Sequence, residues 1–112
     1  MDLTPYVTLE QLRIQARLEP DDAYLDGTLQ LYAAAAFHAI EAHTGRKLYS
    51  AGADLPADAP ENALQATENI QLAMLMMVAH WFDNPAAATD GATAEIPLGF
   101  RFLVDPHRWI TL

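Results

Sequence analysis

Four histidines are the side chains best suited to bind a metal ion or to move a proton, and two of them share one segment. His38 and His43 stand five positions apart in a stretch with helical spacing. A helix that holds zinc places two histidines four positions apart, so that both imidazoles lie on one face. Five positions turn the rings about 140° apart. The spacing favours ordinary histidines, and we expect no metal and no cofactor.

Carboxylates are numerous, with fifteen Asp and Glu, but their positions favour helix ends over catalysis. Asp21, Asp22 and Asp26 crowd the expected start of one helix, and Glu61 stands at the expected start of the next. Carboxylates there cap free backbone N–H groups and complement the helix dipole. The chain has no cysteine, and it contains no glycine-rich phosphate loop and no nucleophile elbow. We expect no enzymatic activity.

Apolar residues at helical spacing account for most of the chain and predict an all-α fold. A capping box at Thr8 and Gln11 marks the start of a short first helix. The expected helices span residues 9–17, 22–43, 61 to 82 or 83, and 98–104, with loops at about 49–60 and 85–96 and a C-terminal tail at 107–112. Two long and two short helices predict a small antiparallel bundle, which forms a single domain over residues 1–112. No strand is expected, because no segment shows a convincing alternating pattern.

The second expected helix carries local signals at both ends. Asp21 or Asp22 is placed to cap its first turn. Gly45 is expected to end it in the left-handed conformation, and Arg46 and Lys47 are placed to meet its carbonyl end.

The third expected helix is apolar on two sides. Its main stripe consists of Ala63, Ala66, Thr67, Ile70, Met74, Met77, Val78 and Trp81. Leu72, Leu75 and Met76 point roughly 120–220° away from that stripe. A helix that is apolar on two sides needs cover on both. We expect one side to face the core and the other, with Met76, to contact a neighbouring subunit.

His80 and the tail complete a candidate interface. His80 projects from a different face than Trp81, which favours a histidine at a helix boundary or an interface. Arg108 and Trp109 are of types enriched at interface hot spots, although a Trp109 that folds back on its own domain is an equal alternative. The candidate subunit or partner interface is therefore Leu72, Leu75, Met76, His80, Arg108, Trp109 and Ile110.

The charge balance excludes several classes of partner. Six Lys and Arg against fifteen Asp and Glu give a formal net charge of −9. Tight binding to a phosphate backbone or to an anionic membrane surface requires cations that displace counterions. The most apolar run, residues 72–82, has about half the length of a bilayer span. The charge suits a surface that DNA passes without adhering.

The order of these motifs resembles the small head-to-tail connector proteins of long-tailed bacteriophages, of the HK97 connector type. Proteins of this kind, also called head-completion or adaptor proteins, have been described as possible DNA-packaging proteins. The resemblance runs from Val7 to Arg108 and rests on residues 7–13, 20–25, 40–46, 70–84, 96–100 and 103–108. It departs at residues 84–87, Asn-Pro-Ala-Ala, where the family tends to carry a charged segment.

The resemblance implies a structural virion protein at the head-tail interface, assembled in the cytoplasm of the host bacterium. Such a connector forms a homo-oligomeric ring of about a dozen copies beneath the portal protein. It extends the DNA channel without binding DNA specifically, and it offers a platform for a tail or stopper protein. No membrane is involved.

Two other classes of protein remain as alternatives. A small acidic helical regulator, either a DNA mimic or an antitoxin-like binding protein, would explain the charge and the lack of a catalytic set. It predicts a compact dimer with acids on one face, whereas the acids here are spread along the chain. A small metal-dependent enzyme is the more distant alternative.

Overall fold

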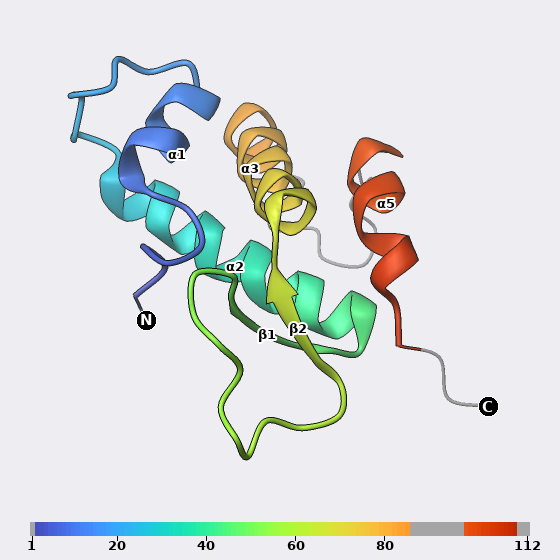
Figure 1. Ribbon diagram of the computed structural model, residues 1–112. Coiled ribbons are helices and arrows are strands. Elements are labelled where there is room, and N and C mark those ends of the chain that lie inside the picture. The colour runs from blue at the N-terminus through green and yellow to red at the C-terminus, as the bar shows by residue number, and fades with distance from the viewer. Residues whose placement is uncertain (1, 86–97, 110–112) are drawn as a thin grey trace.

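The computed structural model describes residues 2–85 and 98–109, which pack around one apolar core (Figure 1). In chain order the elements are α1 (Leu9–Gln15), α2 (Asp26–Thr44), β1 (Lys47–Ser50), β2 (Ala63–Ala66), α3 (Glu68–Asp83), α5 (Leu98–Val104) and the 3-10 turn η2 (Asp105–His107). Helix α3 packs along α2, α1 covers one end of this pair, and α5 packs on the far side of α3 (Figure 1).

Local signals set both ends of α1. The Gln11 N–H donates to Thr8 Oγ1 at 3.1 Å, and the Thr8 N–H donates to Gln11 Oε1 at 2.9 Å, which confirms the capping box. The helix ends at Gln15, two residues before the expected end, because Arg17 adopts a left-handed backbone with φ of 64°.

Helix α2 begins later than expected and ends as expected. Asp22 does not cap it: its Oδ1 accepts the Tyr24 N–H at 3.1 Å and holds a local turn, so the helix starts at Asp26 after Leu25. The prediction that Asp21 or Asp22 caps this helix is therefore wrong. Gly45 has a φ of 68°, and its N–H donates to the Glu41 carbonyl at 2.9 Å, which confirms the left-handed end.

The fold is mostly helical, but it is neither strictly all-α nor a plain antiparallel bundle. Strands β1 and β2 pair in parallel, with Leu48 opposite Leu64 and Ser50 opposite Ala66. The segment Ala63–Ala66, expected as the first turn of the third helix, is thus a strand, and α3 starts at Glu68 after Thr67. The Arg46 side chain, just before β1, stabilises the strand pair, because its guanidinium donates to the Asn62 and Ala63 carbonyls at the start of β2. Arg46 therefore does not meet the end of α2 as expected.

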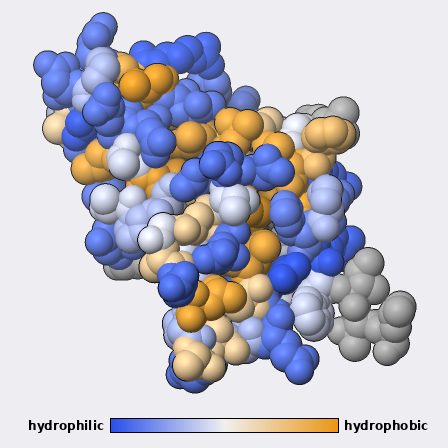
Figure 2. All heavy atoms as spheres, viewed as in Figure 1, coloured by the Kyte–Doolittle hydropathy of each residue, from blue (hydrophilic) through white to orange (hydrophobic). Residues whose placement is uncertain are grey.

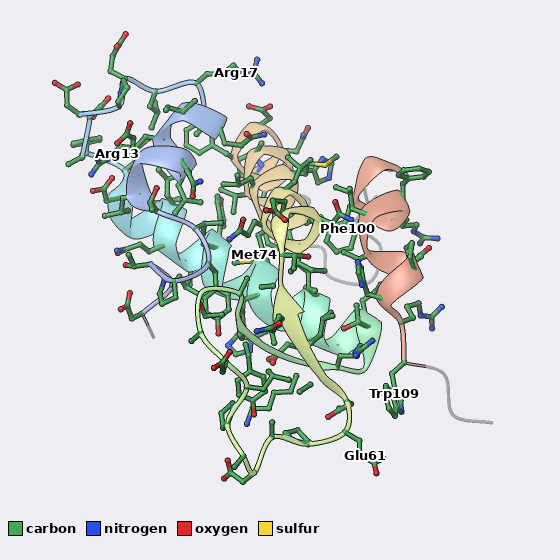
Figure 3. All side chains as sticks on the ribbon, viewed as in Figure 1. Arg13, Arg17, Glu61, Met74, Phe100 and Trp109 are labelled. Atoms are coloured by element: carbon green, nitrogen blue, oxygen red, sulfur yellow. The ribbon has the colours of Figure 1, made fainter. Side chains whose placement is uncertain are left out.

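The core lies between α2 and α3. The expected stripe on α3 is confirmed in its centre, where Ile70, Met74 and Val78 are fully buried, and in Figure 3 Met74 lies between the two helices. Ala33 and Ala36 of α2 are also fully buried. Small side chains at these positions let the helix backbones approach closely.

Candidate functional site

The second apolar side of α3 is covered in part by α5 of the same chain. A Cβ placed on Gly99 would lie 2.5 Å from Met76 Cε, so the Met76 side chain rests directly against the backbone of α5. Leu75 is half-buried against the core, whereas Leu72 is 45% exposed. Of these three interface candidates, Leu72 is the one that presents a large surface to solvent.

His80 lies near the end of α3, half-buried. Its Nε2 is enclosed and has no hydrogen-bond partner among residues 2–85 and 98–109. The His80 carbonyl accepts both the backbone N–H and the side-chain amide of Asn84, at 2.9 and 3.0 Å. These bonds end the helix at the Asn84-Pro85 stop that the sequence indicated.

The last described residues fold back on the end of α2 (Figure 3). The Trp109 N–H donates to the Thr44 carbonyl at 2.6 Å, and the Arg46 guanidinium lies 5.5 Å from the centre of the Trp109 ring. Trp109 therefore contacts its own chain, and 42% of the residue stays exposed. Arg108 is exposed, and Ile110 lies outside the described residues.

The two histidines of α2 contact different carboxylates. His43 Nε2 lies 2.6 Å from Asp105 Oδ1 in η2, and the His43 ring packs edge-on to Phe100 of α5. His38 Nδ1 lies 3.6 Å from Glu41 Oε1, on the solvent side of α2. No cluster of three or more His, Cys, Asp and Glu suited to a metal ion occurs in the described part of the chain. His43 thus ties the C-terminal turn to α2.

Asp26, the first residue of α2, ties this helix to α1. Asp26 accepts two hydrogen bonds from Arg13, at 2.9 Å from Nε and 2.5 Å from Nη2, and a third Arg13 nitrogen donates to the Pro20 carbonyl at 2.8 Å. The hydrogen bonds from Arg13 lower the pKa of the Asp26 carboxyl below its usual value. Glu61, expected at a helix start, instead lies exposed before β2 and points away from the fold (Figure 3).

A shallow hollow of about 870 Å³ lies between the start of α3 and the segment formed by α5 and η2. It is lined by Asn69, Arg101, Phe102, Leu103, Asp105 and Pro106, which we call the α5 face. Phe102 is 81% exposed there. Leu72 follows Asn69 by three positions on α3 and therefore lies on the same side of that helix.

Phe102 is not among the interface residues predicted from the sequence. Phe100 and Val104 are four positions apart and buried, so a helix here must turn Phe102 outward. Phe100 and Phe102 are two positions apart in α5, so a helix places them on opposite sides and the core can bury only one of them.

Comparison with known protein families identifies the chain. The family model described as Phage gp6-like head-tail connector protein matches residues 6–108. The chain belongs to this family. Its members are structural connector proteins of bacteriophages, which agrees with the resemblance in the sequence. Searches among curated proteins and among solved structures gave no match. In the described residues, no helix is both long and apolar enough to cross a bilayer.

Proposed function

We propose that this protein forms a closed ring of copies between the portal protein and the tail. The ring extends the DNA channel and presents a platform for a tail or stopper protein. The observation that carries the proposal is the family match, which spans nearly the whole chain. The protein acts by binding other proteins, and we propose no chemical step for it.

The charge supports passage of DNA without tight binding. The net charge is −9, and four of the six cations are engaged within the fold. Arg13 and Arg17 pair with Asp26 and Asp83, Arg46 contacts backbone carbonyls, and Lys47 lies over the Tyr49 ring. A channel wall with few free cations displaces few counterions, so it does not retain DNA.

The exposed members of the candidate interface remain available for contacts in a ring. Leu72, Arg108 and Trp109 are exposed, and we propose that they contact a neighbouring copy or the portal. Met76 and Leu75 lie beneath this surface. Met76 packs against the backbone of α5, and Leu75 packs against the core. We propose that His80, which is half-buried near the end of α3, belongs to the same contact surface.

The distribution of the acids does not favour the alternative of a DNA mimic. Asp26, Asp83 and Asp105 are paired with basic side chains on three different elements, and Glu41 accepts the Leu48 N–H at 3.0 Å. A mimic needs its carboxylates free and gathered on one face.

Disruption of the gene in its phage tests the proposed function. We expect cells to accumulate heads and free tails that do not join, and expression of the wild-type protein from a plasmid to restore tailed virions. Electron microscopy of the lysate, with a count of tailed and tailless heads, gives the readout. Tailed virions at the wild-type level in the absence of the protein would contradict the proposal.

A further inference from the structure

Two strongly exposed aromatic residues lie at opposite ends of the molecule. Phe102 on α5 is 81% exposed, and Tyr24, in the segment between α1 and α2, is 90% exposed. Figure 1 shows that this segment and α5 flank the α2–α3 pair from opposite sides. With the α2–α3 pair between these two segments, Tyr24 and Phe102 do not meet within one copy.

The two ends also differ in charge. Arg101 and Arg108, on α5 and just after η2, make no side-chain hydrogen bond or ion pair with residues that the structure describes. At the other end Glu19, Asp21 and Asp22 are all exposed. Figure 2 shows mostly hydrophilic surface at the end that holds α1 and the following segment, whereas apolar surface extends toward α5.

We propose that the α5 face binds residues 19–25 of a second copy. The Tyr24 ring of one copy occupies the hollow beside Phe102 of the next, and the carboxylates of Asp21 and Asp22 lie beside Arg101 and Arg108. The inference rests on the proposed function and assigns the contact between ring neighbours. Because the two surfaces differ, the contact is heterologous and repeats from copy to copy until a ring closes.

The segment that carries Tyr24 is held in shape before it binds. Asp22 Oδ1 accepts the Tyr24 N–H at 3.1 Å, and Arg13 donates to the Pro20 carbonyl at 2.8 Å. A preorganised segment loses less conformational entropy on association. Tyrosine and arginine are also the residue types that contribute most often to binding hot spots.

Cross-linking through introduced thiols tests the contact, because the chain has no cysteine of its own. The double variant Tyr24→Cys/Phe102→Cys is oxidised and run on a non-reducing gel. We expect a ladder of covalent oligomers, about tenfold or more above the matched control Leu31→Cys/Leu55→Cys, whose positions are also exposed. A 1:1 mixture of the two single variants, Tyr24→Cys and Phe102→Cys, is expected to stop at a covalent heterodimer. This mixture keeps the test valid if the double variant folds poorly.

The possible results separate this contact from the ring itself. Cross-linking no higher than in the control pair would overturn the contact, as would homodimers of the Tyr24→Cys variant as the main product. Electron microscopy of the same wild-type protein, with and without portal, reports ring closure independently. Closed rings without 24–102 cross-links would leave the proposed function standing and remove this inference. Cross-linked open chains that never close would support the contact and contradict the ring.

Discussion

The Arg13–Asp26 pair joins α1 to the first residue of α2 through two hydrogen bonds, and both side chains are largely shielded from solvent. Its contribution depends on pH in a defined direction. The pKa of the Asp26 carboxyl is lowered in the folded state, chiefly by the hydrogen bonds from Arg13, below a value of 3.8 in the unfolded chain. The stabilisation is therefore complete above the unfolded pKa and is lost as the pH falls through the lower, folded pKa.

We expect Asp26→Asn to lower the urea midpoint of unfolding at pH 7, because it removes the charge that Arg13 pairs with. The difference from wild type should shrink when the pH falls below the folded-state pKa of Asp26, where the wild-type carboxyl is protonated too. Asp58→Asn, at an exposed position in the β1–β2 connection, is the matched control. A difference that does not change as the pH falls, or that equals that of the control at pH 7, would contradict this assignment.

Alanine substitutions at Gly27, within α2, and at Gly45, at its end, should change the free energy of unfolding in opposite directions. Gly45 has a φ of 68°, so Gly45→Ala is expected to cost about 1–2 kcal/mol of unfolding free energy, although the added Cβ has room beside Trp109 at 3.7 Å. Gly27 lies in the first turn of α2 with no atom within 4 Å of an added Cβ. Gly27→Ala should stabilise the protein by up to about 1 kcal/mol. Chemical denaturation measures the unfolding free energy of each variant. A change in the same direction for the two variants would contradict this prediction.

At the scale of elements, α3 carries most of the packing, since α2 lies on one side and α5 on the other. Met74→Ala removes a fully buried side chain between α2 and α3 and is expected to cost about 2–5 kcal/mol. Leu72→Ala on the same helix should cost no more than about 1 kcal/mol, because Leu72 is 45% exposed. Urea denaturation of both variants gives the comparison. Similar costs for the two would show that the burial pattern of α3 is wrong.

Elements with local boundary signals could be predicted from the sequence. The seven residues of α5 match the prediction because Asp105-Pro106 marks their end, and Thr8 and Gly45 mark helix ends through their own backbone contacts. The β1–β2 pair could not be predicted in this way. It depends on contacts between segments far apart in sequence, such as those from Arg46, and Ala63 and Ala66 also fit the spacing of a helix.

The candidate interface could be predicted only in part, for a related reason. The spacing of apolar residues correctly predicted two apolar sides for α3, but the sequence does not show which element covers the second side. Gly99 supplies that cover at Met76, because a residue without a side chain lets α5 approach closely. The α5 face could not be predicted, because the sequence places Phe100 and Phe102 on opposite sides of a helix but does not show which of the two the core buries.

At the scale of the whole molecule, we propose that copies of this phage connector assemble into a ring on the portal. Two unlike surfaces at opposite ends favour a closed heterologous assembly over a symmetric dimer.

Native mass spectrometry of the protein mixed with the portal of its own phage, with the protein alone alongside, distinguishes a ring on the portal from a dimer or a free monomer. We expect a closed ring of about a dozen subunits bound to the portal, at a fixed stoichiometry over a wide range of concentration. A plain dimer, or monomers that never bind the portal at any concentration, would contradict the account.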